Sequence, residues 1–424
     1  MRINKASVIV FFLVTLTFFA DALLGVIAYY SLSIPSPPVI LRAVILIFSV
    51  FAVFSIKYYK VEKLLLILML VSGIAAIIWG NINHSYSEVL HDISLLSKVL
   101  YGPMIFFLLL NVVQNFPVSN YLISRALLYG SIITASFILI PSYLGIGIDN
   151  YEEVSGSGTR GLLFTGNESG LQLGMLFGVA IRQMFLVNHR WLGIVSTLVI
   201  ALALNSLQTR FSMLALLVSP LAVLIIKFTI EGNKKIDANL TRRMVLVSIS
   251  ISVLGLFWVA FDSFISNDFQ KSRLESSLAG DLPRAIQIAI GFNYLHNRDI
   301  SYDLFGEGDS GWRKSNSRNY NEKASEVGQA ELDWLDLFGS YGTFFSLAFY
   351  GFYLRIIIKV WQHLRQKDRV LAAVSLLGML FYFLHAFVAG HAMSSAAPSG
   401  VFMYLVIWNV SASLKNKSLS RVQS

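Results

Sequence analysis

The chain of 424 residues contains no cysteine, and only 13% of its residues are charged. The absence of cysteine excludes disulfide scaffolds, thiolate metal sites and cysteine nucleophiles. Soluble domains carry roughly 25% charged residues, so the shortage of charge excludes an ordinary cytosolic enzyme and a disordered chain. In place of charge the chain has 55% hydrophobic residues and a mean hydropathy of +0.65. This composition is typical of a membrane protein.

Apolar stretches of the length that crosses a bilayer, about 20 residues, recur along almost the whole chain. Backbone polar groups in hydrocarbon must be satisfied within the segment, so each stretch is predicted to be a helix. Twelve spans are predicted, at 7–30, 39–56, 64–80, 99–114, 126–144, 168–187, 191–209, 211–227, 244–262, 337–359, 371–389 and 398–413. The predicted fold is therefore an all-α polytopic membrane protein. Helices one to nine occupy 1–262, one large loop occupies 263–336, and helices ten to twelve with a tail occupy 337–424.

Lysine and arginine are concentrated in alternate connections between the predicted spans. With the N-terminus in the cytoplasm, most of the 33 basic residues and few of the 24 acidic ones fall on the cytoplasmic side. This is the positive-inside pattern, and it predicts that both termini are cytoplasmic and that the large loop lies on the opposite face. The net charge of +9 is explained by this topology, so no nucleic-acid partner is expected.

Three arginines stand at the outer ends of predicted spans. Arg160 lies in the glycine-rich run 158–167, Arg210 lies between two nearly contiguous spans, and Arg284 lies on a helix that is expected to begin at Asp281. A guanidinium binds phosphate oxygens in a bidentate fork and keeps its charge near lipid. Arginines that converge beneath an outer loop would suit a diphosphate, whereas each one singly could anchor a helix end or pair with an acid.

A group of carboxylates leads into span ten. On one helix Asp333 and Asp336 share a face, while Glu331 and Asp333 lie about 160° apart, so all three cannot serve one site directly. One of them could act as a general base and another could hold an arginine. Ligation of a hard cation and a merely solvated helix entry are the alternatives.

The seven histidines show no catalytic pattern. His391, which follows span eleven, is a candidate to line a site, with packing at the interface as the alternative. The histidines in short connections are expected to be exposed and without partners: His84, His91, His189 and His363. No zinc-binding spacing of histidines and no serine–histidine–acid arrangement is visible, which argues against a zinc hydrolase or a serine hydrolase.

The order of these motifs resembles the superfamily of bacterial O-antigen ligases and Wzy-type polysaccharide polymerases. The likeness runs from about residue 155 to 395. It consists of Arg160-Gly-Leu-Leu-Phe-Thr-Gly-Asn167, Thr209-Arg210-Phe-Ser, the Arg284 helix, Leu304-Phe-Gly-Glu-Gly308, Glu331-Leu-Asp333, Gly339-x-x-Gly342 and Gly390-His391.

The resemblance implies a metal-independent glycosyltransferase that needs no cofactor and works on the periplasmic face of the bacterial inner membrane. Its substrates would be undecaprenyl-diphosphate-linked glycans in the lipid bilayer, and a chain-length regulator protein is a further expected partner. The family role of holding the lipid diphosphate maps onto Arg160, Arg210 and Arg284. Further residues expected to line the site are Asn167, Asp336 and His391.

One departure from the family pattern separates its two activities. Ligases carry a His-Asn pair at the position that is Gly328-Gln329 here. Its absence favours a Wzy-type polymerase over an O-antigen ligase, and it leaves Glu331, slightly preferred, or Asp333 as the candidate base. From another class, a transporter or flippase is the alternative. Transporters place polar residues near the bilayer midplane, whereas the predicted spans hold little charge apart from Asp21 and Arg42 near their ends.

Overall fold

The computed structural model describes residues 5–422 except 35, 81–85, 117–119, 151–157, 187–189, 232–282, 319–331, 364–368 and 389. The structure is 86% helical. Its helices are α1 (Lys5–Tyr29), α2 (Pro37–Ser55), α3 (Lys60–Gly80), α4 (Tyr86–Asn115), α5 (Asn120–Tyr143), α6 (Gly166–Met184), α7 (Arg190–Leu207), α8 (Arg210–Glu231), α11 (Pro283–Asn297), α12 (Ile300–Phe305), α13 (Gly308–Arg318), α14 (Asp333–His363), α15 (Arg369–Val388) and α16 (Ala396–Val422). Two short strands, β1 (Ile148–Asp149) and β2 (Thr159–Gly161), pair antiparallel.

Among the described residues, nine helices are long and apolar enough to cross a membrane: α1 to α5, α7, α8, α14 and α15. The prediction of an all-α polytopic membrane protein is confirmed at this level. Two further predicted spans correspond to α6 and α16. Nearly every residue of α6 is buried, and so is every residue of α16 from 397 to 411. These two helices face protein rather than lipid, so they need less hydropathy. The predicted span 244–262 lies outside the described residues.

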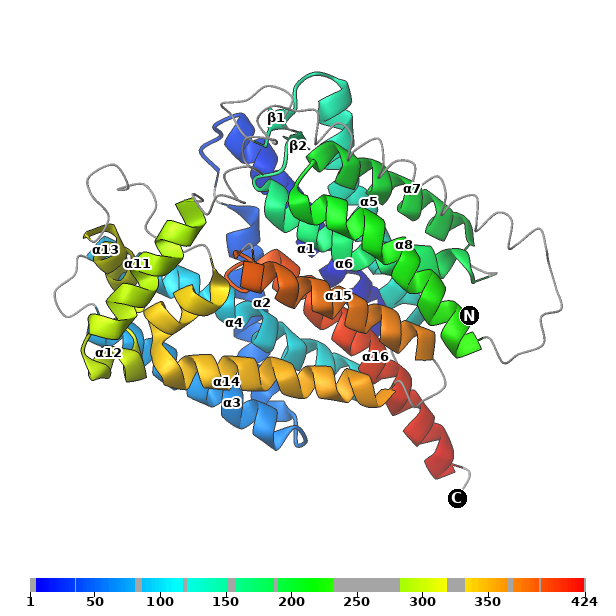
Figure 1. Ribbon diagram of the computed structural model, residues 1–424. Coiled ribbons are helices and arrows are strands. Elements are labelled where there is room, and N and C mark those ends of the chain that lie inside the picture. The colour runs from blue at the N-terminus through cyan, green and yellow to red at the C-terminus, as the bar shows by residue number, and fades with distance from the viewer. Residues whose placement is uncertain are drawn as a thin grey trace.

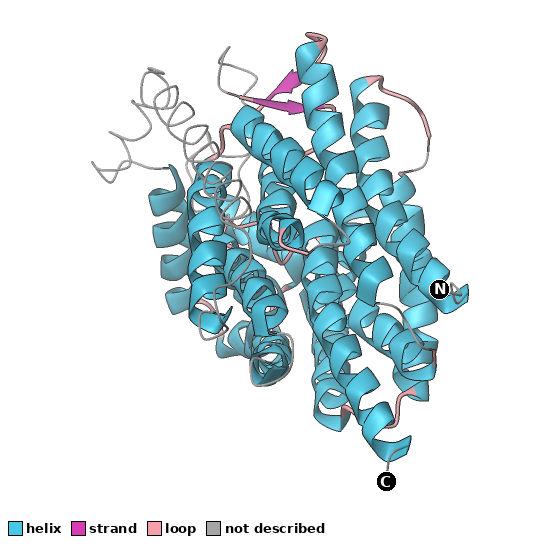
Figure 2. Ribbon diagram, turned by 90° about the vertical axis from the view of Figure 1, so that its right-hand side faces the viewer, coloured by secondary structure: helices cyan, strands magenta, loops and turns pink. Residues whose placement is uncertain are grey.

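One end of the bundle, named here the loop end, holds β1–β2, α11–α13 and residues 390–395 (Figure 1). Figure 2 shows the strand pair at one end of the stacked helices and the C-terminal end of α16 at the other. Close backbone contacts confirm this arrangement. A Cβ on Gly25 of α1 would collide with the Leu162 carbonyl after β2, and one on Gly80 of α3 would collide with the Glu307 carbonyl before α13.

The helices α11, α12 and α13 form a cap over α3, α4 and α14. The helix expected after Asp281 is confirmed as α11, whereas α12 and α13 were not predicted, because their sequences are polar and short. Helices α12 and α13 join at two glycines: Gly306 and Gly308 have φ of 80° and 73°, and α13 begins at Gly308. Helix α14 begins at Asp333, ahead of the predicted boundary at 337.

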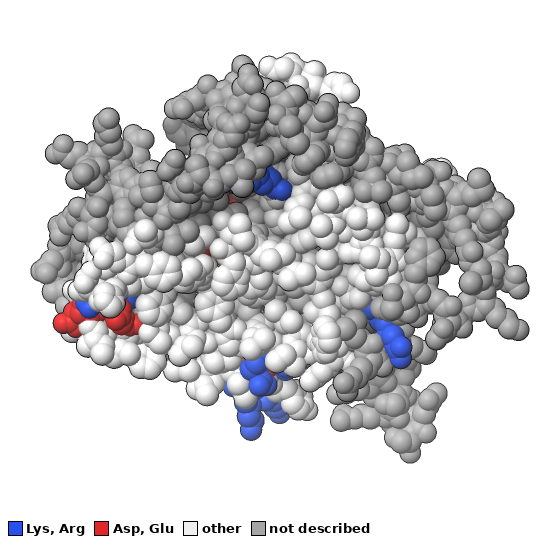
Figure 3. Space-filling model, in the orientation of Figure 1, with Lys and Arg blue, Asp and Glu red and all other residues white. Residues whose placement is uncertain are grey.

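The opposite end of the bundle carries basic side chains around one buried acid. Glu62 of α3 is 1% exposed and accepts from Arg355 and Lys359 of α14, each at 3.0 Å. The pair of Glu62 and Arg355 joins α3 to α14 across 293 residues of sequence. Between the two ends, the described surface in Figure 3 is largely free of charged side chains, as a surface in contact with hydrocarbon requires.

Candidate functional site at the loop end

Helix α4 carries a polar stripe that leads from the cap into the bundle. Its members are Glu88, His91, Lys98 and Tyr101, which lie within about 140° of one another at 100° per residue. The helix starts at Tyr86, well before the predicted span at 99, and these additional turns bear most of the stripe. The upper part of the stripe contacts α13 of the cap. In the lower part, Lys98 interacts with Arg42 of α2 and Glu168 of α6, and Tyr101 hydrogen-bonds to Thr17 of α1.

In the upper part, a histidine is held by a buried aspartate. His91 Nε2 lies 3.0 Å from Asp309 Oδ2, with the imidazole side chain 49% exposed and the carboxylate fully buried. Arg313 Nε donates to the same oxygen at 2.6 Å, and the Ser340 hydroxyl lies 3.5 Å from the other. Burial alone would raise the pKa of Asp309, but His91 and Arg313 outweigh it and the pKa is lowered. The carboxylate is therefore ionised at neutral pH. The expectation that His91 sits unpartnered in a loop is wrong.

In the lower part, residues of α1, α2, α4 and α16 line a small cleft that is partly open to solvent. The polar residues that line it are Thr17, Asp21, Arg42 and Tyr101, and the apolar ones are Ala20, Pro38, Leu41, Ala396 and Ala397. Asp21 Oδ2 and Arg42 Nε are buried and have no hydrogen-bond partner. Buried polar atoms are nearly always hydrogen-bonded. These two unsatisfied atoms therefore mark the cleft as a place where a polar ligand would be stabilised.

Lys98 connects the two parts electrostatically. It interacts with Arg42 of α2 and Glu168 of α6 on one side and with Arg313 and Asp309 of α13 on the other. Glu168 also interacts with Asp21, to which Gln172 of α6 hydrogen-bonds. Charged groups from α1, α2, α4, α6 and α13 thus form one cluster, named here the loop-end cluster: Asp21, Arg42, His91, Lys98, Glu168, Asp309 and Arg313.

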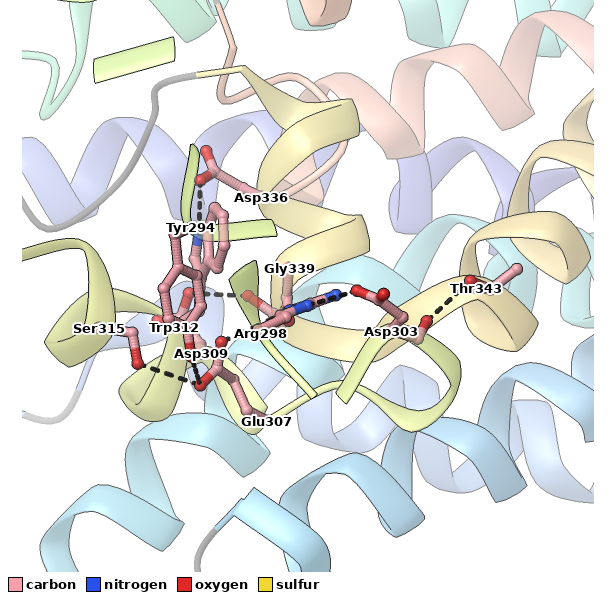
Figure 4. A network of polar contacts seen from close by, with 11 residues as sticks. Tyr294, Arg298, Asp303, Glu307, Asp309, Trp312, Ser315, Asp336, Gly339 and Thr343 are labelled. Carbon is pink, nitrogen blue, oxygen red and sulfur yellow. Dashed lines mark hydrogen bonds and ion pairs between the residues drawn. The ribbon is translucent and has the colours of Figure 1, made fainter. Parts of the chain in front are cut away.

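A second polar network fastens the cap to α14 (Figure 4). Arg298 is 1% exposed at its side chain; its Nε donates to Asp303 at 2.6 Å, and its Nη1 donates to the Gly339 carbonyl at 3.2 Å. Glu307 accepts from the hydroxyls of Tyr294 at 3.0 Å and Ser315 at 3.1 Å. Burial raises the pKa of Tyr294 to about 12, so its hydroxyl keeps the proton that it donates. These contacts hold α11, α12 and α13 to one another and join the cap to α14.

The predicted carboxylates Asp333 and Asp336 take separate partners. Asp333 is 3% exposed. Its carboxylate accepts from the backbone N–H groups of Ala392 and Met393 at 2.6 and 2.8 Å and from the Ser394 hydroxyl at 3.2 Å. Asp336 accepts from Trp312 Nε1 at 2.8 Å (Figure 4). Asp333 therefore ties α14 to the turn before α16, and Asp336 ties α14 to α13.

The turn that Asp333 holds contains the predicted site residue His391. Gly390 and His391 have φ of 67° and 62°, an uncommon conformation for a residue other than glycine. The side chain of His391 interacts electrostatically with Asp333. His391 thus lies at the loop end beside a carboxylate. Glu331, the preferred base, lies outside the described residues.

The arginines predicted to hold a diphosphate belong to three segments. Arg160 is half-buried in β2 and donates from Nη1 to the Phe164 carbonyl at 3.0 Å. Arg210 is exposed at the first position of α8, and Asn167 is half-buried in the first turn of α6. The strand pair and the α7–α8 turn are in contact, because Asn150 donates to the Leu207 carbonyl. Arg160 and Arg210 thus lie at the loop end. Arg284 lies in the first turn of α11, and its side chain is outside the described residues.

The loop-end cluster contains residues that the sequence analysis did not select. Lys98, Glu168, Asp309 and Arg313 were not proposed, and His91 was set aside. The i, i+7 spacing of His91 and Lys98 at the start of α4 was the available signal, since it places both on one helix face. No signal along the chain pairs His91 with Asp309, because they are 218 residues apart.

The fold and the cluster define a class: a polytopic all-α membrane protein with buried charged groups of both signs at one end of its helices. The sequence matches no family model and no curated protein. The geometry of the loop end is therefore the basis for assigning a function.

Proposed function

We propose that the chain is a Wzy-type polysaccharide polymerase of the bacterial inner membrane. It transfers a growing glycan from one undecaprenyl diphosphate carrier to the sugar of a second carrier-linked repeat unit. In this proposal the loop end faces the periplasm and both termini face the cytoplasm, as the distribution of basic residues favours. A chain-length regulator is the proposed protein partner.

The observation that supports this function best is the loop-end cluster itself. Ionisable side chains within membrane helices are costly, and they are retained where they line a substrate site. Arg42 of α2 lines the cleft, and Lys98 of α4 interacts electrostatically with Arg42 and with Arg313 of α13, at the ends of the spans where a lipid-borne head group would lie. Their guanidinium and ammonium groups would neutralise a leaving diphosphate through preorganised positive charge.

Arg42 has the most specific proposed role. Arg42 is 9% exposed, and its buried Nε has no hydrogen-bond partner. A phosphate oxygen would supply the missing acceptor, because guanidinium and phosphate match in charge and in fork geometry. Asp21 and Glu168 offset part of the positive charge and keep the cations oriented when no ligand is bound. A polymerase binds two lipid-linked substrates and therefore two diphosphates. Further proposed contacts to them are Arg160, Arg210 and Arg284.

The apolar lining of the cleft fits a ligand that carries a lipid. Pro38, Leu41, Ala396 and Ala397 border Arg42 and Asp21 without adding charge. A polyprenyl chain would leave such a site directly into the bilayer, whereas a soluble sugar phosphate would gain nothing from it.

Deletion of the gene with analysis of surface glycans on a gel tests the function. A polymerase mutant carries surface lipid capped with a single repeat unit, and this is the result we expect. Bare core with polymer left on its carrier would indicate a ligase instead, and single units stranded on the cytoplasmic side would indicate a flippase. Either pattern would refute the proposal.

Complementation of the deletion strain with point variants tests the residues. Arg42→Ala and Arg210→Ala are expected to leave single repeat units. Arg355→Ala is the matched control, because it removes an arginine that also pairs with an acid on a spanning helix but at the opposite end. Full-length glycan from Arg42→Ala at wild-type membrane levels would refute the role of the cleft.

A further inference from the structure

We propose that His91 is the general base of the transfer reaction and that Asp309 positions it. This inference rests on the proposed function and names the group that accepts the proton. The hydroxyl oxygen of the acceptor sugar forms a bond to the anomeric carbon of the donor glycan. The bond from that carbon to the diphosphate oxygen breaks, and its electron pair leaves with the lipid diphosphate. The hydroxyl proton passes to Nδ1 of His91.

The hydrogen bond to Asp309 gives His91 the tautomer that a base requires. Nε2 lies 3.0 Å from the carboxylate oxygen, so in neutral imidazole Nε2 carries the proton and Nδ1 carries the lone pair. Asp309 itself is held by Arg313 at 2.6 Å and is fully buried. The carboxylate therefore cannot swing away, and it stabilises the imidazolium that forms when the proton is taken up.

The charged surroundings of His91 are otherwise paired. On its own helix, Glu88 lies 2.6 Å from Lys314 of α13. Asp92 accepts from the Ser310 backbone and hydroxyl, both at 2.8 Å. Arg313 is the cation on α13 that faces the same carboxylate oxygen as His91. The half-exposed imidazole is thus the side chain of this group that combines accessibility with a free lone pair.

The position of His91 along α4 suits a base that works beside a diphosphate site. Seven residues separate it from Lys98, so it stands two turns above Lys98 on the same face, about 10 Å along the helix. Lys98 and Arg42 are the cations proposed to hold the leaving diphosphate. A sugar bound on the cap side of that diphosphate has its reacting carbon between Lys98 and His91 along α4, where an acceptor hydroxyl can reach His91.

The carboxylates of the cap are less suited to the same task. Asp333 accepts three hydrogen bonds from the 392–394 turn. Glu307 is bound by Tyr294, Ser315 and Arg298. The oxygens of both carboxylates are engaged by these buried donors, whereas His91 Nδ1 is not needed to hold Asp309.

Polymer synthesis by the purified full-length chain in liposomes, with undecaprenyl-diphosphate-linked repeat units as substrate, tests the inference. His91→Gln is expected to lower the rate at least about 100-fold, the usual contribution of a general base. His296→Gln, which changes an exposed histidine of α11, is the matched control and should keep the wild-type rate. If His91→Gln polymerises at a rate within a few-fold of wild type, His91 is not the general base, and polymer made by the wild type still supports the proposed function. A wild-type protein without product refutes the proposed function instead.

Chemical rescue separates a base from a structural residue. Added imidazole should restore polymer synthesis to His91→Gly but not to Arg42→Ala, because only the first variant has lost a proton acceptor. Asp309→Asn should lower kcat with little change in KM, since it misorients the base without touching substrate. If His91→Gly melts at the wild-type temperature and imidazole restores nothing, His91 is not the base.

Discussion

Substitution of Gly339 by alanine should disrupt the contact on which the geometry of α13 depends. The indole of Trp312 is fully buried between α11, α13 and α14, where it contacts Tyr294 and Leu335. It lies directly against the backbone of Gly339. A Cβ at this position would stand 2.3–2.5 Å from three atoms of the ring, which is far inside van der Waals contact.

Two opposing effects set how far Gly339→Ala changes the free energy of unfolding. Alanine is favoured over glycine inside a helix by roughly 1 kcal/mol. Overpacking of a well-packed core costs about 1–3 kcal/mol, and the cost lies at the upper end where the neighbour is a rigid ring with no free space. Gly339→Ala is therefore expected to destabilise the protein by about 1–2 kcal/mol. It should also displace Trp312 and, with it, Asp309 on the same helix.

The assay compares this variant with Gly351→Ala, which makes the same change further along α14. There the new Cβ would meet only Leu65, at 3.7–3.8 Å, an ordinary contact. Thermal unfolding in detergent, followed by tryptophan fluorescence, should show a lower melting temperature for Gly339→Ala and an equal or higher one for Gly351→Ala. If both variants gain stability alike, the packing of Trp312 against Gly339 is wrong and so is the placement of α13.

Three further outcomes are expected, each measured by thermal unfolding. Because the pKa of Asp309 is lowered in the folded protein, its ionised form stabilises the fold fully above the unfolded pKa of about 3.9, and this stabilisation is lost as the pH falls through the folded pKa. Asp309→Asn should thus melt below wild type at pH 7. A difference in melting temperature that persists undiminished at pH 3 would contradict the ion pair. Glu62→Gln should cost only about 1 kcal/mol, because Arg355 is half-exposed and water replaces part of its contact; the loss should shrink in high salt. Asp333→Asn should lower the free energy of unfolding by about 1–3 kcal/mol, because an amide has one oxygen for the two backbone N–H groups and the hydroxyl that donate to the carboxylate. An unchanged melting temperature would contradict the role of Asp333 in holding the 392–394 turn.

Most of the membrane helices could be predicted, because hydropathy and length decide them before any packing is considered. Hydropathy could not predict where a helix begins or ends when it extends beyond the hydrocarbon. Helix α4 begins at Tyr86 rather than near 99, since its first turns are stabilised by pairs with α13 and not by lipid. Helices α12 and α13 escaped prediction for the same reason: tertiary contacts of Arg298 and Trp312 hold a polar segment in place.

The site was predicted less well than the fold. The sequence pattern favours arginines in the outer connections and gives no weight to charged residues near the ends of spans. In the sequence Arg42 and Asp21 are only charges near span ends, yet both line the cleft and they interact electrostatically. The shared face of Asp333 and Asp336 could be read from helix geometry. Their partners could not, because the 392–394 turn and Trp312 come from other parts of the chain.

The proposed diphosphate site can be tested by measuring the binding of undecaprenyl diphosphate to the purified protein with native mass spectrometry. We expect a bound carrier on the wild type and on Arg355→Ala, and a loss of at least tenfold in occupancy on Arg42→Ala. Equal occupancy on Arg42→Ala and wild type would contradict the claim that the loop-end cluster holds a lipid-borne diphosphate.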